Sequence, residues 1–302
     1  MKNPFAYGKE VSGENFCNRK EEIKELSQDV NNSQNVIIFS QRRFGKTSLI
    51  KEVLRRCKAK GVIVVYVDLY SVLTEEDFVH LYARAVSETI FGKVKKRLRD
   101  ATMFFKRIRP SFSIDQTGQL SWSIDIKKEH ILPSLEDVLE SINRYIENKK
   151  KKGVVCFDEF QQIGQFKTDK LEKMMRSSFQ KHKNISYIFM GSKRHLISEM
   201  FNSPHRPFYK SGKPFPLEKI GDIEISDFIK SKFQQTRINM SGNLVNKIVK
   251  ECESHPYYMQ YLCHIIWEKT IDKKKVMQTD LSECISLLLK RESSTYEATW
   301  DL

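Results

Sequence analysis

The chain has 302 residues, of which 40% are hydrophobic and 11% aromatic, so it can bury a substantial core and is not globally disordered. Its formal charge of +14 favours anionic partners such as nucleotides, nucleic acid or acidic protein surfaces, although a well-solvated basic surface would explain the charge equally well. The six cysteines form no C-x-x-C pair, and no apolar run approaches the roughly 18 residues of a membrane span, so we expect a reduced cytoplasmic protein without a membrane segment.

The first 220 residues alternate between predicted helices and predicted strands. Helical spacing of apolar residues is found at residues 20–29, 47–59, 75–105, 135–148 and 171–182. Segments of strand length in which apolar residues dominate lie at residues 36–39, 62–69, 154–157 and 185–190. The first is a continuous apolar run, typical of a strand covered on both faces. Alternation around Thr117-Gly118 predicts a β-hairpin over residues 112–125. This order favours an α/β fold with a parallel sheet covered on both faces.

The rest of the chain shows no clear strand. A segment with prolines at 204, 207, 214 and 216 is predicted to be a loop. Four helices are then predicted over residues 225–236, 242–252, 256–272 and 279–291. We therefore expect an α/β domain over residues 1–220 and an all-helical domain over residues 221–302.

Residues 40–47, S-Q-R-R-F-G-K-T, follow a predicted strand and precede a predicted helix. They fit the phosphate loop G-x-x-x-x-G-K-S/T, except that Ser40 replaces the first glycine and is expected to adopt a positive φ less cheaply. Gly45 lets the backbone N–H groups face phosphate, Lys46 can reach the β- and γ-phosphates, and Thr47 can hold Mg²⁺. We predict that ATP or ADP is bound by Ser40, Gln41, Arg42, Arg43, Phe44, Gly45, Lys46, Thr47 and Ser48.

Two acids end the third apolar run, where V-V-C-F leads into Asp158 and Glu159. In a parallel sheet such residues emerge at the carboxyl edge, where ligands bind. We expect Asp158 to hold Mg²⁺ and Glu159 to act as the general base that polarises the attacking water. Ser192, which follows the next strand, is placed to read the γ-phosphate. An ordinary strand end with solvated acids, and a simple turn at Ser192, are the alternatives.

Together these segments resemble the archaeal-type ATPases of the STAND branch of AAA+ proteins, which are related to the origin-recognition ATPases. The resemblance rests on N-P-F at residues 3–5, F-C-N-R-K-E-E-I at 16–23, the phosphate loop, D-E-F-Q at 158–161 and S-H-P-Y-Y-M-Q at 254–260. The segment at 16–23 resembles the family pattern F-x-G-R-E-x-E, and the segment at 254–260 resembles the pattern G-H-P-Y-x-x-Q. Asn18 and Ser254 replace a glycine of each pattern.

The resemblance implies a P-loop three-layer sheet of AAA+ type, with strand order 5-1-4-3-2, a β-hairpin insertion and a C-terminal helical lid. It implies that Phe16, Arg19 and Pro256 border the adenine, and that ATP/ADP switching is the output. Many relatives carry a winged-helix domain after the lid, and this chain stops about where that domain would begin. We expect either a trimmed chain or a protein without that module.

Basic residues suggest two further contacts. The basic surface over residues 93–109 could lie along DNA or a protein partner, although a solvated outer face explains it as well. AAA+ enzymes often receive an arginine from a neighbouring subunit, and Arg206 is the candidate for that role in a homo-oligomer. Arg42 and Arg43 could contact phosphate, contact a partner, or form salt bridges within the chain.

The leading hypothesis is an ATP-hydrolysing molecular switch that turns over slowly and couples nucleotide state to a macromolecular partner. In it, Lys46, Glu159 and Ser192 are the catalytic residues. The alternative is a nucleotide-loaded scaffold that docks DNA or protein and hydrolyses little. A small-molecule kinase is a weaker third hypothesis, because no acceptor-substrate pocket can be recognised in the sequence.

Overall fold

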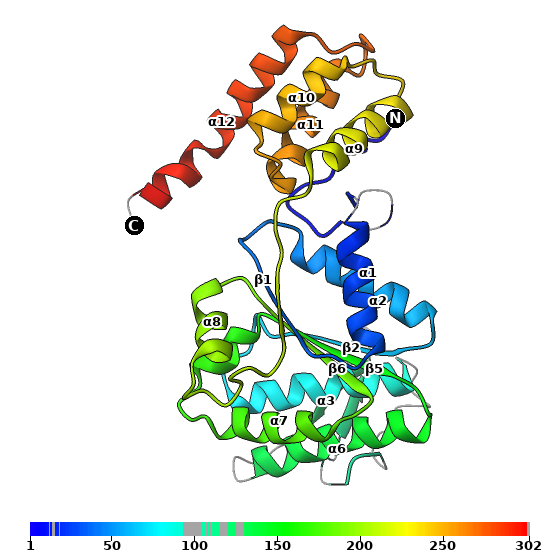
Figure 1. Ribbon diagram of the computed structural model, residues 1–302, viewed down its shortest axis with the longest axis vertical. Helices are drawn as coiled ribbons and strands as arrows, with labels where there is room; N and C mark the ends of the chain where they lie inside the picture. Colours follow the sequence, from blue (N-terminus) through cyan, green and yellow to red (C-terminus); the bar gives the residue numbers. More distant parts are fainter. Residues whose placement is uncertain are drawn as a thin grey trace. The chain divides into compact units, whose positions relative to one another are not determined.

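Figure 1 shows the computed structural model, which describes residues 1–11, 13, 16–17, 19–92, 104–106, 108, 110–114, 120–124 and 130–300. The chain divides into two compact units. One, here called the sheet unit, comprises Glu22–Gln41 and Val53–Pro216. The other, here called the helical unit, comprises Met1–Glu21, Arg42–Glu52 and Leu217–Leu302. The phosphate loop therefore begins in one unit and continues in the other.

Five parallel strands form the sheet, in the order β2-β5-β6-β1-β7. Counted along these five strands alone, the order is 2-3-4-1-5, which is the predicted 5-1-4-3-2 taken from the opposite edge. The prediction of an AAA+ type sheet is confirmed. The strand bounds are Val36–Phe39 for β1, Ile63–Asp68 for β2, Gly153–Asp158 for β5, Ile185–Gly191 for β6 and Lys213–Pro216 for β7.

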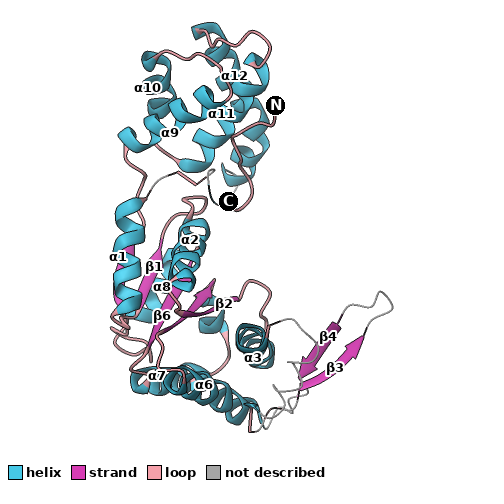
Figure 2. Cartoon of the chain, turned by 90° about the vertical axis from the view of Figure 1, so that its right-hand side faces the viewer, coloured by secondary structure: helices cyan, strands magenta, loops and turns pink. Residues whose placement is uncertain are grey.

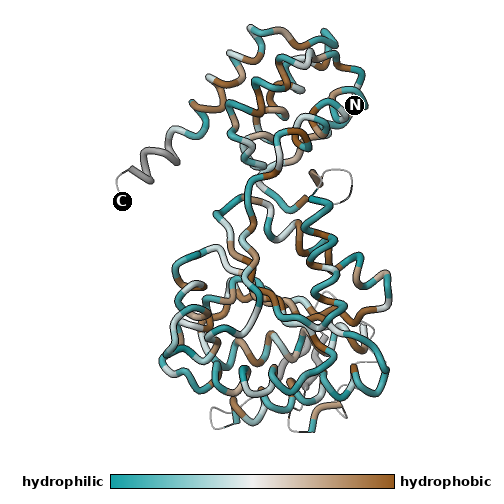
Figure 3. Tube along the Cα trace, viewed as in Figure 1, coloured by the Kyte–Doolittle hydropathy of each residue, from teal (hydrophilic) through white to brown (hydrophobic). Residues whose placement is uncertain are grey.

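Helices cover both faces of this sheet, which confirms the three-layer arrangement (Figures 1 and 2). On one side lie α1 (Lys20–Asn31) and the end of α2 (Lys46–Ala59). On the other side lie α3 (Glu75–Phe91), α6 (Ile131–Asn148) and α7 (Lys170–Lys181), whose apolar faces share one core with the strands. Strands β5 and β6 are buried along their whole length, and the strands are hydrophobic in Figure 3. Burial on both faces explains why their sequences are mostly apolar.

In the sheet unit, the prediction of a proline-rich loop is wrong and the prediction of a β-hairpin is confirmed. The segment predicted to be a proline-rich loop contains β7, which pairs with β1, and it is preceded by helix α8 (Arg194–Asn202). The predicted hairpin is present as the antiparallel pair β3 (Pro110–Ile114) and β4 (Leu120–Ile124), seen in Figure 2. Helix α3 ends at Phe91, and most of the basic surface predicted over residues 93–109 lies outside the described residues.

The helical unit contains the four predicted helices. The chain before α1, here called the lead-in, packs against them through Phe5 and Tyr7. Phe5 is buried, with its ring 4.9 Å from that of Phe233, and Tyr7 stacks on Tyr261 at 4.0 Å. The helices are α9 (Asp222–Gln235), α10 (Gly242–Glu251), α11 (Pro256–Thr270) and α12 (Gln278–Trp300). Helix α12 thus extends beyond the predicted end at residue 291.

All six cysteines of the chain are free and buried. They are distributed over both units, with Cys57 and Cys156 in the sheet unit and the other four in the helical unit. Within the described residues, no helix has both the length and the apolar character that crossing a bilayer requires.

Candidate nucleotide-binding site

The phosphate loop leaves the sheet at the end of β1 and turns through two left-handed residues. Arg43 has φ +66° and Gly45 has φ +82°. Such turns form concavities in which successive N–H groups face an anion. Ser40 has no positive φ, so the cost expected from replacing glycine there does not arise. Its hydroxyl instead donates to the carbonyl of Gln41 at 3.0 Å.

Helix α2 begins directly after Gly45, and its first turn carries the predicted phosphate and metal residues. The Leu49 N–H donates to the Gly45 carbonyl at 2.9 Å, so the helix is regular from its start. Lys46 and Ser48 are buried, and Thr47 is half-buried. The Ser48 hydroxyl accepts from the Val11 N–H at 3.2 Å, which joins the lead-in to the helix start. The positive end of the helix dipole therefore lies at the loop, as an anion site requires.

Arg19 holds the loop from the side of the lead-in. It is buried, with φ +70°, and its Nη2 donates to the carbonyls of Phe44 at 3.2 Å and Glu218 at 2.9 Å. The Phe44 ring meets the His255 ring edge-on at 4.8 Å, next to Pro256 at the start of α11. Phe16 is half-buried in the lead-in. The predicted adenine contacts of Phe16, Arg19 and Pro256 stay predictions.

Arg43 reaches two helices of the helical unit. Its guanidinium lies over the Tyr257 ring, 4.2 Å from the ring centre, and its Nη1 is 3.6 Å from the Glu292 carboxylate. Of the alternatives for this arginine, the structure shows the salt bridge within the chain. Arg42 and Gln41 are exposed.

Asp158 is the last residue of β5 and is buried. Its Oδ1 accepts from the Glu159 N–H at 2.9 Å, and its Oδ2 accepts from the Tyr66 hydroxyl of β2 at 2.8 Å. Burial, with a further contribution from the Asp158 carboxylate, holds the pKa of Tyr66 well above its usual value. Tyr66 therefore stays protonated and fixes the orientation of the carboxylate.

Glu159 and Ser192 lie together at the ends of β5 and β6. The Glu159 Oε2 accepts from the Ser192 hydroxyl at 2.9 Å, from the Ser192 N–H at 3.3 Å, and from the Gln161 side-chain amide. Glu159 has φ +51°, a left-handed conformation at the start of the 3₁₀ helix η3 (Phe160–Gln165). Three donors on one oxygen hold this carboxylate in a defined position.

The strand ends bring these segments to one edge of the sheet. Strands β1, β5 and β6 run parallel, so the residues that follow them all leave from the same edge. Ser40, Glu159 and Ser192 follow those three strands. The prediction that the acids and the phosphate loop depart from the carboxyl edge agrees with this topology.

Two residues that the sequence did not single out support the acids. Tyr66 lies two positions before the end of β2, and its pairing with Cys156 of β5 places it diagonally from Asp158. Gln161 is in the D-E-F-Q segment and is buried. Tyr66 could not be found from the sequence, because its place beside Asp158 depends on the strand register of the folded sheet. Gln161 could have been found, because it stands two residues after Glu159.

Arg206, predicted to serve a neighbouring subunit, pairs within its own chain. Its Nη2 lies 2.9 Å from Oε1 of Glu172, a buried carboxylate of α7. Burial raises the pKa of Glu172 to about 7, although the Arg206 charge acts in the opposite direction.

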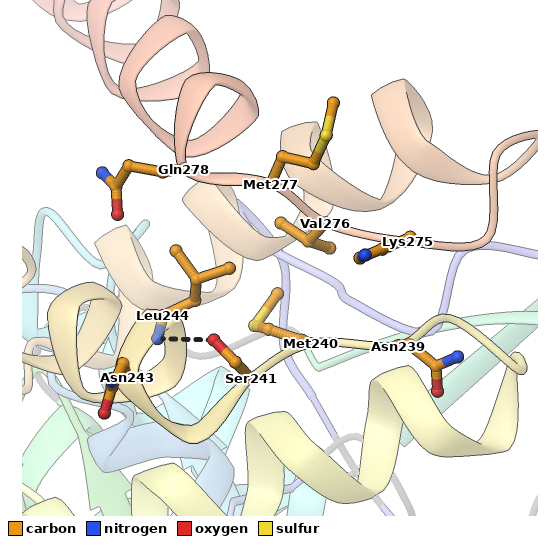
Figure 4. A pocket seen from close by; sticks show the side chains of 9 residues that line it. All are labelled: Asn239, Met240, Ser241, Asn243, Leu244, Lys275, Val276, Met277 and Gln278. Carbon is orange, nitrogen blue, oxygen red and sulfur yellow. Dashed lines mark hydrogen bonds between the residues drawn. The ribbon is translucent and has the colours of Figure 1, made fainter.

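A separate pocket of about 630 Å³ lies in the helical unit (Figure 4). Leu244 at the start of α10 and Val276 and Met277 before α12 give it an apolar lining, and the Ser241 hydroxyl accepts from the Leu244 N–H. None of the predicted site residues lines it.

A phosphate loop after the first strand of a 5-1-4-3-2 parallel sheet, with an acid pair ending the third strand, defines the class of P-loop nucleoside triphosphatases. The chain belongs to the family of ATPase domains found predominantly in Archaea, whose sequence profile matches residues 16–262. The predicted membership of an archaeal-type ATPase family is thereby confirmed. It is an ATPase domain that binds nucleotide. No curated protein matches the chain.

Solved structures with the same fold include a Walker-type ATPase of Pyrococcus abyssi, with a TM-score of 0.67 and 16% identity, over 99% of this chain and 78% of that one. The ORC2 protein of Aeropyrum pernix in its ADPNP–ADP complexes has a TM-score of 0.61 at 12% identity, over 94% of this chain and 71% of that one. The ORC1 protein of the same organism, in complex with DNA, has a TM-score of 0.54 at 12% identity, over 93% and 68%. At these identities the likeness shows the fold.

Proposed function

We propose that the chain is a slow ATP-hydrolysing switch of the STAND type, with ATP and Mg²⁺ as its ligands. The observation that carries hydrolysis is the set of hydrogen bonds around Glu159, whose carboxylate is held by Ser192 and Gln161 at the carboxyl edge of the sheet. This is the edge from which the phosphate loop departs. A carboxylate fixed at the edge from which a phosphate loop departs suits a general base.

Each residue of the proposed site has a defined task. The backbone of the phosphate loop and Lys46 bind the phosphates, and Ser192 contacts the γ-phosphate. Glu159 accepts a proton from the attacking water as the bond between the β- and γ-phosphates breaks, giving ADP and inorganic phosphate. Phe16, Arg19 and Pro256 border the adenine in this proposal.

The oxygen donors present suit Mg²⁺. Thr47 offers a hydroxyl and Asp158 a carboxylate, and this ion typically takes one or two protein oxygens together with substrate phosphates. Within the described part of the chain, no group of three or more His, Cys, Asp or Glu could hold a metal on its own. Bound by Thr47, Asp158 and nucleotide, the ion would neutralise phosphate charge.

Two substitutions test the proposal. Lys46→Ala should weaken ATP binding at least tenfold in a fluorescence titration, whereas Lys58→Ala, an exposed change near the end of the same helix, should not. Glu159→Gln should retain ATP binding and lose most phosphate release, because the amide cannot accept the proton. Native ATP affinity in Lys46→Ala would contradict the phosphate assignment, and an unchanged hydrolysis rate in Glu159→Gln would contradict the base.

The alternative is a nucleotide-loaded scaffold for DNA or protein with little hydrolysis. The formal charge of +14 and the fold shared with a DNA-bound ORC1 protein favour a DNA partner. Purified chain should then retain duplex DNA at low salt and release it as salt rises, and its ATP turnover should be no faster than that of Glu159→Gln. Six free thiols fit a reducing cytoplasm for either function.

Turnover in the switch is proposed to depend on a second copy of the chain or on a partner that supplies a positive charge. Arg206 is the candidate within a homo-oligomer, and it would have to leave Glu172 to serve a neighbouring site.

A further inference from the structure

Three side chains of the helical unit form a charged and aromatic cluster that we call the Arg43 cluster: Arg43, Tyr257 and Glu292. Arg43 comes from the phosphate loop, Tyr257 from α11 and Glu292 from α12. The guanidinium stacks over Tyr257, and the Tyr257 hydroxyl donates to Glu292 Oε1 at 3.3 Å. The cluster therefore connects the nucleotide loop to the last helix of the chain.

The loop needs this support because Arg43 has an unfavourable backbone. A left-handed conformation is unfavourable at a non-glycine residue. A cation over an aromatic ring is attracted to it, less strongly where water reaches the cation, and the Arg43 side chain is 46% exposed. The contact with Tyr257 therefore offsets part of the strain at Arg43.

Glu292 depends on the same arginine. The residue is buried, and its Oε2 accepts no hydrogen bond in the structure. The 3.6 Å separation between Arg43 Nη1 and that oxygen is longer than a good hydrogen bond, so the guanidinium compensates the buried carboxylate mainly by charge. A buried carboxylate that lost this charge would be strongly unfavourable.

We propose that Glu292 and Tyr257 are positioning residues that set the turn of the phosphate loop through Arg43, and that nucleotide binding is coupled in this way to the docking of α12. The inference rests on the proposed nucleotide site. By linkage, any factor by which a docked α12 strengthens ATP binding is the factor by which ATP strengthens the docking of α12. Helix α12 then becomes the element that transmits nucleotide state to whatever follows or contacts it.

Nucleotide titrations of full-length variants test the positioning role. Glu292→Gln keeps the shape and removes the charge, and should raise the Kd for ATP about tenfold. Glu283→Gln, a change on α12 that removes an ion pair with Lys269 of α11, should leave the Kd within twofold. In a chain that already carries Arg43→Met, Glu292→Gln should not change the Kd for ATP further. The single variant Arg43→Lys should retain most of the wild-type affinity.

If Glu292 served only the stability of the fold, Glu292→Gln would lower the melting temperature equally with Arg43 and with Met at position 43. The Kd for ATP would then not depend on Glu292 in either chain.

A gentler variant keeps the test decisive if Glu292→Gln does not fold. Tyr257→Phe retains the ring beneath Arg43 and removes only the hydroxyl that Glu292 accepts, so the Kd should rise two- to threefold. Hydrogen exchange should also slow in α12 when ATP is added to wild type, and much less in the variants.

The outcomes separate this inference from the proposed function. If wild type fails to bind ATP, the nucleotide site itself is wrong. If wild type binds ATP, but Glu292→Gln and Tyr257→Phe match it in affinity and in α12 exchange, only the coupling through the Arg43 cluster is overturned. A tighter Kd in Glu292→Gln would also overturn it, because Glu292 would then compete with phosphate for Arg43.

Discussion

Several residues of the candidate site have a left-handed backbone conformation. Arg43, Gly45 and Glu159 all have positive φ, although only one of them is glycine. Left-handed conformations of other residues persist where surrounding contacts fix them. Arg43 has the ring of Tyr257, and Glu159 has the donors of Ser192 and Gln161. These neighbouring side chains therefore help to hold Arg43 and Glu159 in their left-handed conformations.

Gly45→Ala should weaken both stability and nucleotide binding. A Cβ at this position would meet no atom within 4 Å, so the effect is the cost of a left-handed alanine, about 1 kcal/mol. Gly61→Ala is a matched control, since Gly61 has φ +84° and equally open surroundings. Chemical denaturation should show similar losses for both variants, and ATP titration should show a weaker Kd only for Gly45→Ala. Equal ATP affinities would mean that the loop tolerates the change.

The buried pair of Glu172 and Arg206 predicts a pH-dependent stability. Burial raises the pKa of Glu172 from 4.5 to about 7, so the folded chain holds one proton more than the unfolded chain between these pH values. This contribution to stability is complete below pH 4.5 and is lost as the pH rises towards 7. Relative to Glu172→Gln, wild type should lose up to about 3 kcal/mol across this window, at about 1.4 kcal/mol per unit of pKa.

The comparison with the variant matters because His182 acts in the opposite direction. Burial lowers the pKa of His182 to about 4, so its contribution is present above pH 6.5 and is lost as the pH falls towards 4. Urea denaturation of both chains from pH 4.5 to 7 measures the difference directly. Parallel stability curves would rule out a raised pKa at Glu172.

At the scale of elements, the end of β6 is packed too tightly for any side chain at Gly191. A Cβ there would lie 2.2 Å from Cγ1 of Ile197 in α8 and 2.4 Å from the Gln161 side-chain oxygen. Gly191→Ala should cost about 1–3 kcal/mol of stability by overpacking. By displacing Gln161, it should also slow ATP hydrolysis while leaving ATP binding intact.

Gly242→Ala provides the control for this experiment, because a Cβ at Gly242 would meet no atom within 4 Å. Denaturant melts and phosphate-release assays on the two variants measure both effects. A Gly191→Ala chain as stable and as active as wild type would show that α8 and η3 can move away from the strand.

Helices and strands with a strong apolar pattern could be predicted from the sequence. Strand β7 could not, because it forms by pairing with β1. Strands β5 and β6 are mostly apolar because helices cover both their faces and bury them along their whole length. Strand β7 contains Pro214 and Pro216, which argue against a strand when read alone. It is nevertheless the edge strand beside β1, where an absent N–H can face away from the sheet.

The same limit applies to the site. The positions of Lys46, Asp158, Glu159 and Ser192 at strand or helix ends could be predicted because the sequence marks those ends. The hydrogen bond from Tyr66 to Asp158 and the contact of Arg43 with Glu292 join residues 92 and 249 positions apart. No local pattern encodes such pairings, because the fold determines which elements lie side by side.

For the molecule as a whole, bound nucleotide should raise stability by mass action. ATP at 100 times its Kd with Mg²⁺ should add about 2.7 kcal/mol, because the unfolded chain has no phosphate loop to bind it. Chelation of Mg²⁺ with EDTA should remove much of that gain if Thr47 and Asp158 hold the ion. Thermal melts of wild type and Lys46→Ala, with and without EDTA, measure the effect. An ATP-induced shift that EDTA leaves unchanged would contradict the metal assignment.

The buried cysteines can report when the structure around them opens. Burial raises the pKa of the Cys17 and Cys252 thiols to about 12, so at neutral pH both are protonated and inert towards alkylating reagents. A reagent can modify a thiol only after the surrounding structure has opened. Because Cys57 and Cys156 belong to the sheet unit and the other four thiols to the helical unit, pulsed alkylation followed by peptide mass mapping times each unit's opening separately, with no engineered label.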